Sequence, residues 1–330
     1  MSSIMTNTAA LTALQSLNAT SKSLQETQAR ISTGYRVSQA SDNAAYWSIA
    51  TTMRSDNQAM STVSDALGLG ASKVDTAYTG MNSSIDTLNQ IKTKLVASYG
   101  QTDADKEKTQ TEIAALQKQL KSYADGATFS GTNMLSVSTA SGTAADVKIV
   151  SAFNRDASGA SSISTIDVNV ESIKLYDSGA APTAKGILDA NRLGSTGAAV
   201  TTAAVNPTAG AASAAGDTYS VATLKVYDSA TGKGFSDSQI ADQMKVVDAA
   251  LKDMTNAATT LGAAKSSVDL QKTFTSNLMD SIDRGVGQLV DADMNKESTR
   301  LQALQVQQQL GVQALSIANS STQSIMSLFR

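Results

Sequence analysis

The 330-residue chain contains neither cysteine nor histidine. Without cysteine the chain can form no disulfide and perform no thiolate chemistry, and without both residues it lacks the commonest zinc ligands. Histidine is also the usual general base near neutral pH, so its absence lowers the expectation of catalysis. The sequence has no P-loop, dinucleotide-binding fingerprint or nucleophile elbow. We therefore expect no enzyme, no cofactor and no metal site.

Aromatic residues, prolines and net charge are also scarce. Aromatics make up 4% of the chain, which limits the packing of a core by large rings. The two prolines, Pro182 and Pro207, leave both flanking parts of the chain free of helix breakers. A net charge of −3 without a basic block argues against a nucleic-acid partner. No run of about 18 apolar residues predicts a membrane span, and the N-terminus does not read as a conventional secretory signal.

The two ends of the chain are almost free of charge. No ionisable side chain occurs from Met1 to Ser21 or from Leu301 to Phe329. Apolar residues recur there at alternating intervals of three and four, which places them along one seam of a helix. A membrane-binding helix would carry Lys or Arg on its polar face, and these ends do not. We expect both ends to be disordered in the monomer and to fold when buried against each other or against copies of the chain.

The apolar side chains of these seams are our candidates for a self-assembly interface. Their burial would contribute roughly 25 cal/mol per Å² of apolar surface, against the entropic cost of ordering the ends. The candidates are Leu11, Leu14, Leu17, Leu24, Ile31, Leu301, Leu304, Leu315 and Ile325.

Three long helices are predicted between the two ends. The first begins near Ser41–Asp42 and stops at Gly100, and the second spans residues 103–126. The third begins at a capping box formed by Ser236 and Gln239. These helices would pack as an elongated antiparallel bundle, which brings both chain termini to the same end.

The middle of the chain has a different pattern, with apolar residues that alternate with period two, as in half-buried strands. Residues 194–217 are mostly Ala, Gly, Thr and Ser, a low-complexity surface stretch. We therefore expect a small β-rich domain at the distal tip of the helical rod. The alternating sets are Val147/Ile149, Ile166/Val168/Val170, Ile173/Leu175 and Leu224/Val226.

Two other features could suggest a binding site. Trp47, beside Tyr46, is more readily explained as an interface or core anchor than as a ligand site. The acidic cluster Asp291–Asp293 and the acidic residues at 103–107 lack the spacing of a calcium-binding loop, and they fit solvated faces or helix N-termini.

Both arms of the chain contain distinctive motifs. One is the stretch Ile31–Ala45, with the sequence ISTGYRVSQASDNAA, and another is Phe129–Leu135, FSGTNML. The C-terminal arm contributes Asp291–Met294, Gln308–Gly311 and Ser327–Arg330. Together these motifs resemble those of bacterial flagellins of the alphaproteobacterial type. The resemblance covers about residues 1–136 and 237–330, which is more specific than a single short match.

The resemblance implies a mainly α protein that self-assembles into the flagellar filament, the propeller for swimming. It implies a long antiparallel helical rod formed by the two arms, a coiled-coil-like pair of terminal helices and a small β-rich outer domain. The implied domains are inner-tube helices at 1–40 plus 290–330, a rod with a β-hairpin at 41–136 plus 237–289, and a surface-exposed domain at 137–236.

The resemblance also implies partners and a route out of the cell. The partners are other copies of the chain, a flagellar export chaperone, the filament cap and hook-junction proteins, with no nucleic acid and no membrane. Export would use the flagellar type III apparatus, and the protein would be extracellular.

Many flagellins carry a segment on the long helix that a vertebrate innate immune receptor recognises through an Arg-x-Arg-Glu core. The matching positions here are Gln90, Ile91, Lys92 and Thr93, so the pattern is altered. We therefore expect poor activation of that receptor.

Two other functions remain open from the sequence. A hook–filament junction protein has similar terminal helices, although the match at Phe129–Leu135 and the ordinary flagellin length disfavour it. A secreted adhesin or enzyme carried by residues 137–236 is the other, and the missing His and Cys weaken the enzyme.

Overall fold

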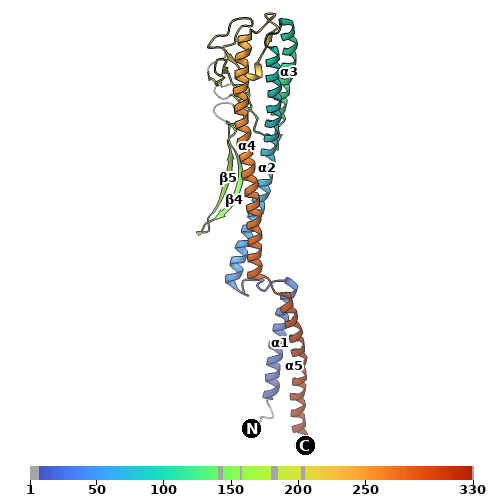
Figure 1. The fold of residues 1–330 in the computed structure, drawn as a ribbon. Coiled ribbons are helices and arrows are strands. Elements are labelled where there is room, and N and C mark those ends of the chain that lie inside the picture. Colours follow the sequence, from blue (N-terminus) through green and yellow to red (C-terminus); the bar gives the residue numbers. More distant parts are fainter. Residues whose placement is uncertain (1–6, 140–143, 157, 180–184, 202–204, 329–330) are drawn as a thin grey trace. The chain divides into compact units, whose positions relative to one another are not determined.

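A computed structural model describes residues 7–139, 144–156, 158–179, 185–201 and 205–328. The fold is mainly α with a small strand-containing middle region, as the sequence predicts (Figure 1). The long helices are α1 (Thr8–Thr33), α2 (Ala44–Ser98), α3 (Asp103–Gly126), α4 (Asp237–Val290) and α5 (Met294–Leu328).

The helix ends are set by local capping. The predicted capping box is confirmed, because Ser236 N donates to Gln239 Oε1 at 3.0 Å and Gln239 N donates to Ser236 Oγ at 3.4 Å. Asn7 caps α1 by accepting from Ala10 N at 3.0 Å. Gly34 ends α1 in the left-handed conformation (φ 76°), which a residue without a Cβ adopts at little cost.

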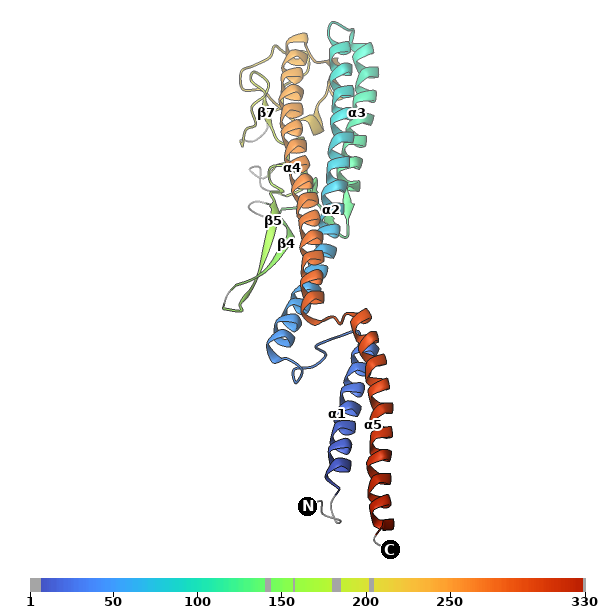
Figure 2. The same cartoon turned by 60° about the horizontal axis from the view of Figure 1, so that its bottom comes forward.

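The chain divides into two compact units. One consists of residues 1–59 and 277–330, and the other of residues 60–276. In the second unit α2, α3 and α4 lie side by side (Figures 1 and 2). Their apolar faces share one core, in which Met81 and Leu88 of α2 meet Met254 of α4.

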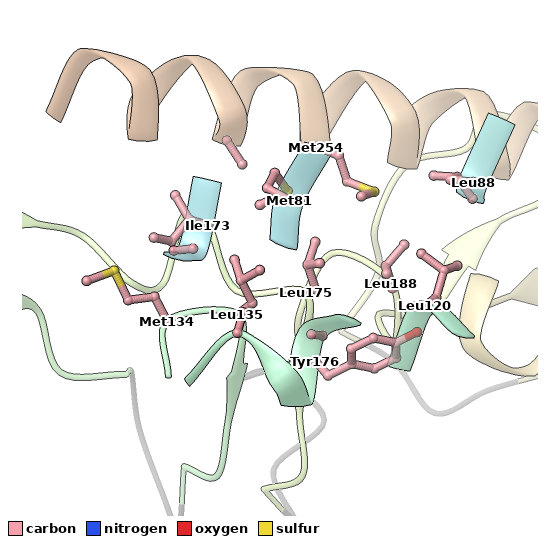
Figure 3. Close-up of a cluster of buried hydrophobic side chains, with 14 of the residues drawn as sticks. Met81, Leu88, Leu120, Met134, Leu135, Ile173, Leu175, Tyr176, Leu188 and Met254 are labelled. Carbon is pink, nitrogen blue, oxygen red and sulfur yellow. The ribbon is translucent and has the colours of Figure 1, made fainter. Parts of the chain in front are cut away.

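The middle of the chain contributes to this same core. Figure 3 shows Leu135, Ile173, Leu175 and Leu188 among the helical side chains, and all four are fully buried. The loops and strands of the middle region are therefore part of the packing of the helices.

Strands occur as two-stranded pairs. The longest is the antiparallel hairpin of β4 and β5, with a register shift between Val150 and Ala152. Ile149 of β4 packs closely on α2 at Gly70. The strands are β1 (Thr128–Phe129), β2 (Thr132–Asn133), β3 (Ser136–Val137), β4 (Val147–Arg155), β5 (Ser161–Val168), β6 (Tyr176–Asp177), β7 (Arg192–Leu193), β8 (Thr218–Tyr219), β9 (Tyr227–Asp228) and β10 (Lys233–Gly234).

The strand predictions are correct in part. Val147/Ile149 lie in β4 and Ile166/Val168 in β5, but Val170 lies beyond the end of β5. The prediction of strands at Ile173/Leu175 and Leu224/Val226 is wrong, because these residues lie in turns and irregular segments. All four are nevertheless buried, so they pack in the core without belonging to a sheet.

Lys174 explains why the alternation at Ile173/Leu175 is misleading. A half-buried strand would point this lysine to solvent, yet its side chain is 1% exposed. Its ammonium group is paired with Glu171 Oε2 and Asp177 Oδ2, each at 2.8 Å. Because the charge is paired, lysine and its apolar neighbours can all be buried together.

Candidate functional site

The terminal helices α1 and α5 lie side by side and antiparallel (Figures 1 and 2). At one end of the pair, Asn7 Nδ2 donates to Ala318 O at 3.0 Å, and at the other Arg30 Nη1 lies 3.3 Å from Glu297 Oε1. Between them Gly311 lies opposite Leu17, where an added Cβ would be 3.4 Å from Leu17 Cδ1, an ordinary van der Waals contact.

On α5 the seam faces α1 in the register that the spacing predicts. One line of half-buried residues alternates by three and four, with exposed residues at most positions between them. These are Leu301, Leu304, Gln308, Gly311, Leu315 and Ala318. Ile325 lies in α5 at a position whose side chain is outside the described part of the structure.

On α1 the candidate residues divide between two faces. Leu17, Leu24 and Ile31 are half-buried and lie on the inward face, together with Ala13, Thr20 and Thr27. Leu11 and Leu14 lie outside this line, and Leu11 is 59% exposed. A single chain therefore leaves part of the apolar surface of α1 in solvent.

A second apolar stripe on α5 is not among the predicted interface residues. Val306, Leu310 and Ile317 are separated by four and seven residues, so they share one face of the helix, on the side away from the seam. All three are exposed, Ile317 by 68%. The spacing of these three residues can be found in the sequence, but the seam pattern on the same helix is longer and more regular, so only the seam was predicted. We call Leu11, Leu14, Val306, Leu310 and Ile317 the outward stripe.

The pair of α1 and α5 carries far fewer charged side chains than is usual for helices exposed to solvent. The Arg30–Glu297 ion pair lies where α1 ends and α5 begins. Beyond it, the described residues of α1 before Lys22 and of α5 after Arg300 carry no charge. Glu297 is buried, and its second carboxylate oxygen has no hydrogen-bond partner. An uncharged helical surface that bears exposed apolar side chains is unusual in a monomer and fits burial by another protein.

The loop between α1 and α2 is tied to the segment between α4 and α5. Tyr35 forms a bridge with Asp291, and Ala292 N donates to Gly34 O at 2.9 Å. Within the loop, Asp42 Oδ2 accepts from Ser38 N and Gln39 N, and these hydrogen bonds lower the pKa of the Asp42 carboxyl. Defined contacts thus hold both connections between the helices.

The positions of the altered receptor motif lie on α2. Gln90 and Thr93 are exposed, and Lys92 Nζ lies 2.6 Å from Asp248 Oδ1 of α4. This lysine is thus held toward α4, and poor receptor activation stays a prediction.

Other kinds of site find no support in the described part of the chain. No group of three or more acidic side chains there is arranged to hold a metal ion. None of the described helices has a stretch long and apolar enough to cross a bilayer.

Two protein families match this chain, one over its N-terminal helical part and one over its C-terminal helical part. The family described as the bacterial flagellin N-terminal helical region matches residues 4–140. The family described as the bacterial flagellin C-terminal helical region matches residues 244–329. The chain belongs to the bacterial flagellin family. This flagellin is a structural subunit of the flagellar filament, which places it outside the cell.

Relatives match this flagellin over its whole length. Flagellin C of Rhizobium meliloti strain 1021 is 48% identical over 334 residues, and a flagellin of Brucella melitensis is 47% identical over 330 residues. Flagellin A of Rhizobium meliloti is 43% identical over 401 residues. Each match covers 100% of both chains, and together they identify the alphaproteobacterial type. None favours the hook–filament junction protein or the secreted adhesin.

Proposed function

We propose that this flagellin builds its filament by burying the outward stripe of α1 and α5 against neighbouring copies. The apolar residues of the seam between α1 and α5 are half-buried within one chain, so their contacts hold the two helices together. The outward stripe has no cover in the single chain, and Ile317 and Leu310 are its most exposed members on α5. Full burial of such a side chain contributes about 1.5–3 kcal/mol.

The observation that carries this proposal is the coincidence of apolar exposure with missing charge. A charge on these helices would be costly in a crowded interior where every face meets protein. The two faces of the pair then have separate tasks: the seam with Leu17 and Leu315 joins the helices of one subunit, and the stripe joins subunits.

Aspartate substitutions on the two faces test this division. Ile317→Asp should abolish polymerisation while the monomer keeps the helix content of the wild type, because the seam is intact. Leu17→Asp and Leu315→Asp should also abolish polymerisation, but with a loss of helix content confined to the terminal helices. Sedimentation and electron microscopy measure filaments, and circular dichroism measures helix content. The matched control Ile317→Leu, which keeps the apolar surface, should polymerise normally.

Filaments of normal yield from Ile317→Asp would contradict the assignment of the outward stripe. An unchanged helix content in Leu17→Asp would contradict the assignment of the seam or indicate that the ends are disordered in the free subunit, as the sequence predicts. Amide exchange of the wild-type monomer separates these two explanations.

We also propose the division of the filament subunit that the resemblance implies. Support comes from the chain breaks between α1 and α2 and between α4 and α5, and from family matches that end at residue 140 and resume at 244. The two compact units have different boundaries from the parts of this division. Val37 and Ala50 pack with Val286 and Val290, so the adjoining ends of α2 and α4 belong to the same compact unit as the terminal helices. The proposed parts are 1–40 plus 290–330 lining the filament interior, 41–136 plus 237–289 around them, and 137–236 facing outward.

The remaining expectations belong to the same proposal. This flagellin would be exported by the flagellar type III apparatus with an export chaperone, and would meet hook-junction and cap proteins at the ends of the filament. It would carry no catalytic activity, which the absence of His and Cys supports.

A further inference from the structure

Three aromatic side chains remain partly exposed around the start of α2. Tyr35, Tyr46 and Trp47 are 38%, 41% and 38% exposed. Two guanidinium groups lie over the tyrosine rings: Arg54 is 4.8 Å from the centroid of Tyr35, and Arg36 is 5.9 Å from that of Tyr46. We call these five residues the aromatic–arginine patch.

The backbone of the patch is held in place by several hydrogen bonds. Asn43 caps α2 by accepting from Tyr46 N through its side chain at 3.1 Å and from Trp47 N through its carbonyl at 2.9 Å. Arg36 N donates to Val290 O at 2.6 Å, and Tyr35 is bridged to Asp291. The aromatic rings are therefore presented from a preformed backbone, which reduces the entropic cost of binding.

The composition of the patch is that of a protein–protein contact. Trp, Tyr and Arg are the residues most enriched among interface positions that dominate binding energy. Beside the patch is a groove of about 530 Å³ lined by Arg30, Arg36, Tyr35, Tyr46 and Asp42 among others, and it offers space for side chains of a partner. Trp47 is too exposed to be a core anchor, which leaves the interface explanation.

We infer that a second copy of this flagellin covers the aromatic–arginine patch in the filament. This inference rests on the proposed function and adds a second contact to the outward stripe. The patch lies in the same compact unit as α1 and α5, and is connected to them through the Gly34–Ala292 hydrogen bond. The groove beside the patch is lined by charges of both signs, Arg30 and Arg36 together with Glu26 and Asp42, so it is complementary to a surface of mixed charge such as that of another copy.

The protein carries its own reporter, because Trp47 is the single tryptophan. On polymerisation of the wild type we expect a blue shift of its emission and an acrylamide quenching constant lowered about threefold or more, as the indole leaves water. Filaments with the emission and quenching of the monomer would overturn the inference, while leaving the outward stripe intact. A failure of the stripe variants to affect assembly would instead contradict the proposed function.

Substitutions give an independent measure. Trp47→Ala should raise the critical concentration for polymerisation about tenfold, the effect typical of a dominant interface residue. Trp47→Phe, which keeps a buried ring, should recover most of the loss. Ile163→Ala on β5, which removes another strongly exposed apolar side chain, is the matched control and should polymerise like the wild type. Equal circular dichroism of the monomers excludes misfolding, and a wild-type critical concentration for Trp47→Ala would overturn the inference.

Discussion

Two glycines two residues apart on α2 have opposite structural roles. A Cβ on Gly70 would clash with Ile149 Cγ2, so the β4–β5 hairpin can dock on α2 only because this position has no side chain. A Cβ on Gly68 would have no atom within 4 Å. Gly70 is therefore required by packing, whereas Gly68 only weakens the helix.

We expect Gly70→Ala to destabilise the protein by about 1–3 kcal/mol, the usual cost of overpacking. Gly68→Ala, the control on the same helix, should stabilise it by up to about 1 kcal/mol through helix propensity. The double variant Gly70→Ala/Ile149→Ala should lose less than the sum of its single substitutions, because it relieves the clash. Thermal unfolding followed by circular dichroism measures all of these. Equal stability of the two single alanine variants would contradict the proposed close approach.

At the scale of an element, the segment 171–179 is held by a buried ion-pair network. Asp177 Oδ2 lies 2.8 Å from Lys174 Nζ and accepts from Thr139 Oγ1 at 2.6 Å, and Oδ1 accepts from Gly179 N at 2.8 Å. Burial raises the pKa of the Asp177 carboxyl, but the hydrogen bonds from Lys174, Thr139 and Gly179 outweigh it and hold this pKa far below its usual range. The ionised form of Asp177 therefore stabilises this segment relative to the protonated form.

The free energy of unfolding should therefore decrease as the pH falls through the acidic range. Because the pKa of Asp177 is lower in the folded than in the unfolded state, its contribution is complete above about pH 4 and is lost as the pH falls toward the folded value. Asp177→Asn should lower the free energy of unfolding at neutral pH and flatten its decline between about pH 4 and pH 2. Chemical denaturation across this pH range measures the difference. Parallel pH curves for the variant and the wild type would exclude Asp177 as the titrating group.

At the scale of the whole molecule, the middle region and the helices share one hydrophobic core, so neither is expected to be stable without the other. Ile173, Leu175 and Leu188 pack against the same cluster as Met81 and Leu120, so removing the middle region would expose the helical core. The described residues of the low-complexity stretch make fewer contacts of this kind. Gly194 N donates to Asp217 O at 2.9 Å, but Gln239 Nε2 of α4 also donates to Thr208 O at 2.9 Å, and Ala209 is buried with Phe235 and Ile240.

Two deletions separate these contributions. Replacing residues 195–216 with a short Gly-Ser linker should lower stability moderately, because buried Gln239 loses its bond to Thr208 O and Ile240 loses its contact with Ala209. Polymerisation should be preserved, since the proposed interface lies elsewhere. Deleting residues 137–236 should lower the melting temperature strongly, because Met81, Leu88 and Leu120 would lose their cover. Calorimetry and filament yield measure the outcomes. A thermal stability of the larger deletion equal to that of the wild type would contradict the shared core.

Local pattern in the sequence was enough to predict the helices, the capping box at Ser236, the α5 seam and the family. The cap of α2 was predicted at Ser41–Asp42, but Asn43 caps this helix. The capping box at Ser236 and the helix over 103–126 involve only neighbouring residues, so their chemistry is readable without a fold. The charge-free ends and the scattered motifs likewise pointed to a filament subunit.

Tertiary structure alone decided which residues of α1 face inward and which apolar segments of the middle region form strands. Strict heptad spacing predicts Leu14 on the α1 seam, yet Ala13, Thr20 and Thr27 lie on the inward face and Leu14 is 47% exposed, because the position of α5 decides which face of α1 is covered. Ile173 and Leu175 are buried without a strand because Lys174 pairs with Glu171 and Asp177, three residues away on either side, within an irregular segment that buries all three residues 173–175. The period of an apolar pattern is a local property of the sequence, whereas the segment that covers each helix face is decided by the tertiary fold. For this reason the exposed stripe on α5 was identified only from the structure.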